Sequence, residues 1–349
     1  MREVAIVSFA QSAKARDQRN EVEILMPVVR EAVKASGLPR TEIGFTCSGS
    51  SDYLQGQSFA FVGALDAVGA WPPIKESHVE MDGAWALYEA WIKIQTGDVD
   101  SALVYSFGKS SPGDIAEVLA LQLDPYTVTP LWPDAHSLAA LQARAFLEAT
   151  GKSERDLAEV AVRSRRSAIG NPHAVVSGEF DVAKLLLEPC VSSPLRAHDL
   201  PPVTDGASAL VMVAGERARK LCARPVWIRG IDHRIEPQGL GVRELARSAS
   251  TEIAGAKAGV HKGRVDLAEL HAPYSHQELI LRAALGLGES VDVNPSGGAL
   301  ASHPLMAAGL VRIGEAALRL MARDGDRAVA HATQGPCLQQ NLVCVLEGD

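Results

Sequence analysis

Cysteine is scarce in this sequence, and the few cysteines follow no recognisable spacing. Only five of the 349 residues are cysteine, with no CxxC pair and no spacing typical of a metal site. A disulfide framework needs an even, closely spaced set. We therefore expect no disulfides and no metal site, and we expect the chain to work in a reducing cytoplasm. The five are Cys47, Cys190, Cys222, Cys337 and Cys344.

The sequence also lacks a basic block and a long uncharged apolar run. It has 34 Lys and Arg against 42 Asp and Glu, for a net charge of −8, so we expect no nucleic-acid partner. A membrane helix needs about 20 consecutive apolar residues. The apolar run within residues 3–10 is too short for that, and too short for a signal peptide with its cleavage site. We expect no membrane insertion.

Aromatic residues are few, whereas small apolar residues are abundant. Aromatics make up 5% of the chain and hydrophobic residues 47%, with many Ala, Gly and Val. This composition suits closely packed layers of helix and sheet, and the chain is long enough for two core units. Strand and helix patterns alternate along the sequence, which predicts an α/β protein.

The order of elements near the N-terminus recurs near the C-terminus. Each copy has a strand running into a polar loop, then an almost wholly apolar helix (84–97 and 304–325), then another strand. The best match joins "TGDVDSALVYSFG" (96–108) to "DGDRAVAHATQG" (324–335). We predict two copies of one α/β unit of about 110 residues each.

A different region separates the two copies. Residues 109–199 hold Pro-containing loops and amphipathic helices with little strand pattern, and we predict that they form a loop domain capping one face. The N-terminal half then comprises residues 1–108 together with 200–222. The C-terminal half comprises 223–349.

One candidate for chemistry lies just before the second apolar helix. In "DVNPSGGALASHPLMAAGL", Asn294 and Gly298 belong to a polar, glycine-rich turn and His303 follows it. Because a helix N-terminus has a positive potential, a histidine there has a lowered pKa and can act as a base near neutrality. The alternative is a packing histidine beside a glycine loop.

A second candidate is the end of a strand in "AELHAPYSHQEL". Sites in α/β sheets form at the carboxyl ends of strands, so we expect His271, Tyr274 or both to line a pocket. We expect His276, at the start of the next helix, to face solvent. Cys337, in a Gly-Pro loop, is either a site thiol or a buried one. The start of the first apolar helix, "ESHVEMDGAWALY", offers the carboxylates Glu80 and Asp82.

These motifs resemble the thiolase superfamily, in particular its lipid-transfer (sterol-carrier) branch. "NPSGGALASHP" is similar to that family's Asn-x-x-Gly-Gly…Gly-His-Pro loop, and "ELHAPYS" to the Glu-x-His-Asp-Cys-Phe segment of the branch. "PPVTDGASALVMVA" resembles the Asp-Gly-Ala-Ala strand, and "HSLAALQARA" the His-Met-Gly…Ala-Glu segment of the capping region.

The resemblance implies a fold and a substrate class. It implies the five-layer α-β-α-β-α thiolase fold with an inserted loop domain, an acyl-CoA substrate, and a dimer across the sheet of the first half. It also implies that His303 is the activating histidine, that His271 holds the oxyanion-binding position, and that His136 lies beside the substrate. Asn294, Gly298 and Cys337 are expected at the substrate as well.

The departures from the family pattern decide the predicted chemistry. The nucleophile tetrad Cys-Ala-Ser-Gly reads "EMDG" here, which puts Glu80 in the nucleophile's place. Acyl transfer by a thiolase needs a thiolate, and "QGPCLQQN" lacks the glycines of the family's second cysteine motif, so the match of Cys337 to that motif is doubtful. A classical thiolase is therefore disfavoured.

The predicted activity is retro-aldol cleavage of a β-hydroxyacyl-CoA without a covalent intermediate, as in actinobacterial steroid side-chain aldolases of this branch. His303 and His271 are the expected acid–base and oxyanion groups, with Tyr274 as a second proton-transfer group and Glu80 or Asp82 as an alternative base. No cofactor is expected beyond the coenzyme A of the substrate. Expected partners are a second copy or a thiolase-like chain, and a small OB-fold protein. The alternatives are an acyl-CoA acetyltransferase that uses Cys337, and a non-catalytic subunit.

Overall fold

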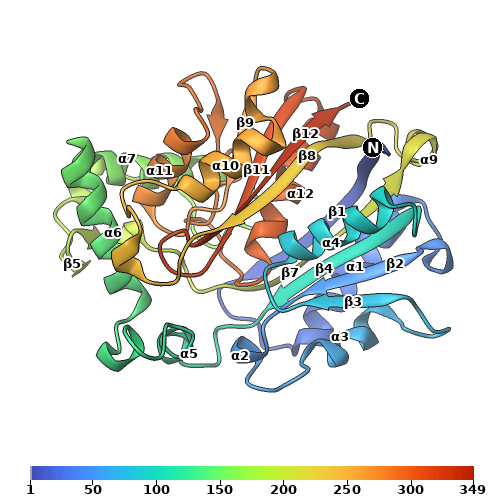
Figure 1. The fold of residues 1–349 in the computed structure, drawn as a ribbon, viewed down its shortest axis with the longest axis horizontal. Helices are drawn as coiled ribbons and strands as arrows, with labels where there is room; N and C mark the ends of the chain where they lie inside the picture. Colours follow the sequence, from blue (N-terminus) through green and yellow to red (C-terminus); the bar gives the residue numbers. More distant parts are fainter. Residues whose placement is uncertain (1) are drawn as a thin grey trace.

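A computed structural model describes residues 2–349 and contains one mixed sheet of ten strands, ordered β10-β9-β11-β12-β8-β1-β7-β4-β2-β3 (Figure 1). The strands are β1 (Val4–Lys14), β2 (Phe45–Gly49), β3 (Glu76–Val79), β4 (Ser101–Gly108), β7 (Asp205–Ala214), β8 (Val226–Ile235), β9 (Leu267–Leu270), β10 (Asp292–Val293), β11 (Arg327–Gln334) and β12 (Gln340–Gly348). A short hairpin, β5 (Cys190–Ser192) and β6 (Leu195–Arg196), lies apart from it.

The sheet consists of two halves with the same pairing. In the first half β1 pairs antiparallel with β7 and β7 with β4, while β4, β2 and β3 run parallel. In the second half β8, β12, β11, β9 and β10 repeat this scheme in the same order. Among residues 2–349, the two half-sheets are joined by pairing of two residues of β1 with β8. The predicted duplication is therefore confirmed at the level of strand pairing.

Helices form three layers around the two half-sheets. The helices are α1 (Glu21–Ser36), α2 (Asp52–Gln55), α3 (Phe61–Val68), α4 (Gly83–Gln95), α5 (Ile115–Leu121), α6 (Ala135–Thr150), α7 (Glu154–Ser167), α8 (Val182–Leu185), α9 (Gly215–Leu221), α10 (Ala249–Ala258), α11 (Ser275–Ala284) and α12 (Ala308–Ala322). The apolar helices α4 and α12 share one core with the inner faces of both half-sheets. Helices α1 and α3 cover the outer face of the first half, and α10 and α11 that of the second. This is the expected α-β-α-β-α arrangement.

Local sequence signals explain where helices begin and how closely they pack. The first helix starts at a capping box in which Asn20 and Glu23 bond each other's backbone N–H, and it ends at Gly37 with φ 71°. In α12, Gly314 lets the helix approach β1, because a Cβ there would lie 2.1 Å from the Phe9 ring. No helix among residues 2–349 is long and apolar enough to span a membrane.

The region between the copies forms a cap at one side of the layers. Helices α5, α6 and α7 and the β5–β6 hairpin lie there, to the left and lower left in Figure 1. Helix α6 packs against α11, and α7 packs against α11 as well. The cap therefore rests on the second half beside the loops that follow its strands.

Candidate active site

A cavity of about 440 Å³ lies between the cap and the N-terminal ends of the two central helices. Its walls come from α5 and α6, from residues 201–204, from the loops after β9 and before α12, and from residues 333–340. Segments far apart in sequence thus meet at one point. Of the nine predicted site residues, six line this cavity: Asp82, His136, His271, Tyr274, His303 and Cys337.

Two histidines from the second half face each other in the cavity. Nε2 of His271 lies 2.9 Å from Nε2 of His303, and both side chains are buried. Burial lowers the pKa of His271 well below its ordinary value, helped by the neighbouring histidines. Burial, and then the charge of Arg312, lowers the pKa of His303 to about 4. Both rings are therefore neutral near pH 7.

The hydrogen bonds of this pair define which nitrogen carries each proton. The backbone N–H of Thr333 donates to Nδ1 of His271 at 3.3 Å, and only an unprotonated nitrogen accepts. Neutral His271 then carries its proton on Nε2 and donates it to Nε2 of His303, whose own proton is on Nδ1. In the free protein, the lone pair of the His303 Nε2 atom is already engaged by its neighbour.

The lowered pKa of His303 has a different cause from the one expected. Helix α12 begins at Ala308, five positions beyond the histidine, and Pro304 forms an isolated bridge with Thr204 instead of a first helical turn. The helix N-terminus therefore does not reach His303. Burial in the loop and the charge of Arg312 lower the pKa of His303, and the helix potential that was expected to lower it does not act there.

Asp82 is the group that occupies the helix N-termini. Its carboxylate accepts the backbone N–H groups of Ala84 at the start of α4, and of Gly309 and Leu310 at the start of α12, at 2.8–3.0 Å. Burial raises the pKa of Asp82 to about 7, although these hydrogen bonds and the charge of Arg312 act in the opposite direction. Asp82 joins the two central helices beneath the cavity and can hold or release a proton near neutrality.

A tyrosine–histidine pair lies on the cap side. The hydroxyl of Tyr274, at the start of α11, is 3.0 Å from Nδ1 of His136 on α6. Burial raises the pKa of Tyr274, so it stays protonated. Burial lowers the pKa of His136, and the nearby Asp134 partly opposes this. The pair provides a second place where a proton can move within the cavity.

Cys337 is in the cavity but is not prepared as a nucleophile. Its Sγ donates to the carbonyl of Leu138 at 3.4 Å, and burial raises its pKa to about 11 despite the charge of Arg243. A reactive cysteine needs a lowered pKa. Cys344 is fully buried in β12.

Three predicted site residues lie outside the cavity wall. Glu80, in the nucleophile's place of the motif, turns away: its Oε1 accepts the Asp52 N–H at 2.6 Å and its side chain is 47% exposed. Asn294 and Gly298 belong to the turn before His303 and are not among the residues that line the cavity. Gly298 has φ 63°, and a Cβ there would lie 2.8 Å from Cγ of Asn294.

The expectation that His276 faces solvent is wrong. Its side chain is fully buried and its Nε2 lies 3.1 Å from Oε1 of Gln142 on α6, so it joins α11 to the cap. Burial lowers the pKa of His276 to about 3. The cap covers this face of α11, which sequence periodicity alone does not reveal.

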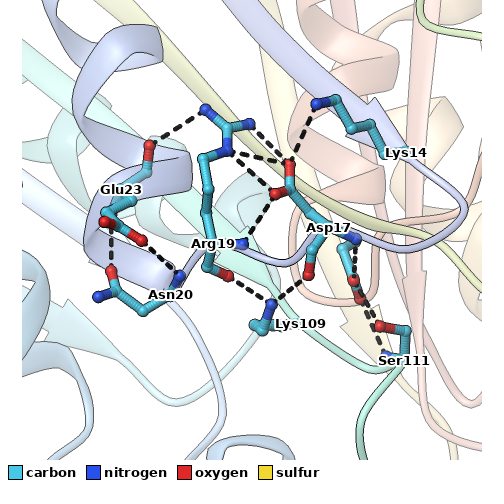
Figure 2. Close-up of polar contacts among 8 residues, drawn as sticks. Lys14, Asp17, Arg19, Asn20, Glu23, Lys109 and Ser111 are labelled. Atoms are coloured by element: carbon cyan, nitrogen blue, oxygen red, sulfur yellow. Dashed lines mark hydrogen bonds and ion pairs between the residues drawn. The ribbon is translucent and has the colours of Figure 1, made fainter.

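Sequence reasoning missed the part of the cavity wall that directly follows β4. Ser110 lines the cavity in the loop after β4, and a polar cluster fixes that loop (Figure 2). Asp205 accepts the N–H groups of Asp17 and Ser111, both at 2.9 Å. Lys109 donates to the Asp17 carbonyl at 2.6 Å. Asp205 belongs to the segment that resembles the Asp-Gly-Ala-Ala strand, and no sequence signal pointed to Ser110 itself.

No cluster of three or more His, Cys, Asp or Glu that could hold a metal ion occurs among residues 2–349. The acid–base chemistry available in the cavity comes from its imidazoles, carboxylate and phenol. Such an arrangement can move protons and can donate hydrogen bonds to a developing oxyanion.

Known proteins resemble this chain in structure and in sequence. A solved structure described as an "Ltp2-ChsH2(DUF35) aldolase" superposes with a TM-score of 0.82, at 19% identity, over 99% of this chain and 98% of that chain. The chain has the thiolase fold. No family model matches the sequence.

The sequence relatives include a thiolase subunit and an acetyl-CoA acetyltransferase. The chain is 28% identical over 233 residues to the benzoylsuccinyl-CoA thiolase subunit BbsB of Thauera aromatica, and this match spans about three fifths of the length of BbsB (60%) and 58% of this chain. It is 26% identical to an acetyl-CoA acetyltransferase of Methanocaldococcus jannaschii, over 90% of this chain and 89% of that protein. Within this thiolase fold, the cavity holds the two histidines.

Proposed function

We propose that this protein binds an acyl-CoA and cleaves a carbon–carbon bond of a β-hydroxyacyl-CoA by a retro-aldol reaction, without a covalent intermediate. The observation that carries the proposal is the neutral His271–His303 pair in a cavity whose single thiol has a raised pKa. Proton transfer and oxyanion stabilisation are available there, whereas an activated nucleophile is not.

The first step uses the hydrogen bond between the two histidines. When the thioester oxygen accepts a hydrogen bond from the Nε2–H of His271, the hydrogen bond from that group to Nε2 of His303 is broken. The lone pair on Nε2 of His303 is then free, and His303 can act as a base. Substrate binding thus both places an oxyanion donor and releases the base.

The bond changes then follow in order. His303 removes the proton of the β-hydroxyl, and the oxygen's electrons form a carbonyl. The Cα–Cβ bond breaks and its electron pair passes to Cα and the thioester oxygen as an enolate, which His271 stabilises. The ketone or aldehyde leaves, and protonation of Cα by the His303 imidazolium gives the shorter acyl-CoA. Tyr274, paired with His136, serves as a second donor toward the leaving carbonyl oxygen.

The walls of the cavity support a bulky apolar acyl group. Ile115 and Leu119 of α5 and Leu123 shortly after its end line the cavity, and the prolines at positions 201 and 202 lie among the other lining residues. A steroid or sterol side chain with its ring system fits such a surface chemically. Among the described residues that line the cavity there is no Lys or Arg, so we place only the acyl thioester inside and the CoA phosphates outside.

We also propose partner chains. BbsB is named as a subunit, and the Ltp2 structure is described together with ChsH2(DUF35). Among the described residues, β3 is a sheet edge that pairs with β2 alone. A homodimer or thiolase-like heterodimer across this edge, with a small OB-fold partner, is the assembly that we propose.

The test is incubation with a 3-hydroxyacyl-CoA that has a tertiary hydroxyl and a bulky apolar tail, alone and with a DUF35 partner protein. Formation of the ketone and the shorter acyl-CoA in equal amounts supports the proposal, and His303→Ala is expected to abolish it. Glu80→Gln is the matched control, because Glu80 lies outside the cavity and its loss is expected to leave the rate within about twofold. Failure of wild type to release either product, with and without the partner, would refute the lyase.

An acyl-CoA acetyltransferase that uses Cys337 is the second candidate, and the names of the relatives favour it. It requires an acyl-cysteine that can be trapped with acetyl-CoA and found by peptide mass spectrometry. A third candidate, a non-catalytic subunit, is favoured by the word subunit in the name of BbsB. It predicts that a co-purified complex keeps full activity with His303→Ala in this chain.

A further inference from the structure

A line of buried polar contacts joins the cap to the strand end that carries His271. Arg163 on α7 forms an ion pair with Oε1 of Glu278 on α11. The other oxygen of Glu278 accepts Nδ2 of Asn294 at 2.8 Å. Oδ1 of Asn294 in turn accepts the backbone N–H of Leu270 at 2.7 Å. The contacts thus connect α7 of the cap with α11, with the turn after β10 and with the end of β9.

Asn294 extends the sheet by one residue at the place where the strand pairing stops. Strand β10 ends at Val293, and Asn294 leaves the strand direction with φ 53°. Its side chain then supplies the acceptor for Leu270, and the neighbouring His271 donates its own N–H to the carbonyl of His331 on β11 at 3.2 Å. The backbone at Leu270 and His271 is therefore held from both sides.

Glu278 controls the orientation of that asparagine. It is 1% exposed, so its carboxylate depends on Arg163 and Asn294 for compensation. An amide placed between a carboxylate and a backbone N–H must direct its NH₂ to the first and its oxygen to the second. The carboxylate thus fixes which way Asn294 points, and the arginine anchors the carboxylate to α7.

We infer that Glu278 is a positioning residue for His271, and that Arg163 couples the placement of the capping helix α7 to the geometry of the histidine pair. The inference rests on the proposed function only in taking His271 as a site residue. Its structural part concerns the backbone at Leu270 and does not depend on the reaction. Arg163 thereby has a partner within the chain.

Three variants separate the contacts. Glu278→Gln keeps the size of the side chain and one acceptor, but directs an NH₂ toward Arg163 or Asn294. Arg163→Met removes the cation alone, and Arg163→Lys restores a charge. Arg166→Met is the matched control, because Arg166 lies on the same helix and its ion pair with Glu179 is exposed on both sides.

The main measurement is hydrogen exchange of backbone amides by NMR without substrate. Glu278→Gln and Arg163→Met are expected to speed exchange of the Leu270 amide at least tenfold relative to a buried amide of the first half, such as Val104. Arg163→Lys is expected to restore most of the protection, and Arg166→Met to change neither amide. Equal acceleration at Leu270 and Val104, or none at Leu270, would overturn the inference.

A second measurement follows the imidazole of His271 directly. Its ¹⁵N shifts report which nitrogen is protonated, and the Thr333 contact predicts an Nε2–H form that becomes mixed with the other tautomer in Glu278→Gln. In a lyase assay the same variant is expected to lower kcat with little change in KM. If wild type shows no lyase activity, the proposed function fails while the exchange and ¹⁵N results still decide the inference.

Discussion

Asp82 gives the protein a stability that depends on pH in a predictable way. Its carboxylate is buried between the starts of α4 and α12, and its pKa rises from an ordinary value of 3.8 to about 7. Between these values the unfolded chain has already released the proton while the folded chain keeps it. Folding is therefore favoured most below the lower value, and this contribution is lost as the pH rises toward the upper one.

The size of the effect follows from the two pKa values. Their difference corresponds to about 4 kcal/mol in total, of which roughly 2.5 kcal/mol falls between about pH 5 and about pH 8. Asp82→Asn removes the charge and with it this slope. The free energy of unfolding of the variant, minus that of wild type, is therefore expected to be roughly 2.5 kcal/mol larger at about pH 8 than at about pH 5.

Urea unfolding followed by tryptophan fluorescence measures the difference at several pH values. Buried histidines such as His303 and His331 also titrate, and their lowered pKa values make the protein less stable as the pH falls. They are present in both proteins and cancel in the comparison. A difference between variant and wild type that stays constant from about pH 5 to about pH 8 would refute the reasoning on Asp82.

Three further predictions follow from single side chains. Because the pKa of His303 is about 4, lyase activity is expected to stay constant from about pH 8 to about pH 6 and to fall only toward pH 4. A midpoint near 6.5 in the pH–rate profile would contradict His303 as the base. Iodoacetamide followed by peptide mass spectrometry is expected to label exposed Cys190 well before Cys337, and equal rates would show that the cavity thiol is activated. Gly314→Ala places a methyl group in the Phe9 ring and is expected to cost about 1–3 kcal/mol in urea unfolding; an unchanged midpoint would show that α12 moves away from β1 without cost.

The sequence was informative about candidate residues that directly follow a strand or directly precede a central helix. His271, Tyr274 and His303 lie at such points and all line the cavity. Strand ends of one half-sheet meet at one edge, so residues that follow them come together even when far apart in the chain. The pairing of the strands also repeats, as the matching segments at 96–108 and 324–335 indicate.

Orientation within a turn was not available from the sequence. Glu80 and Asp82 are two positions apart, yet one turns toward α2 and the other caps two helices. His276 appeared exposed because nothing local shows that α6 covers it. Asn294 bonds a strand and a buried carboxylate, and this depends on tertiary contacts that no local pattern encodes.

The central claim is cleavage of an acyl-CoA without an acyl-enzyme, and the mass of the intact protein during turnover tests it most directly. Wild-type protein mixed with the 3-hydroxyacyl-CoA and quenched in acid on the millisecond to second scale is expected to show an unmodified mass at every time, while ketone and shorter acyl-CoA accumulate together. An acyl adduct that forms and decays at the rate of product release, and that maps to Cys337, would contradict the account.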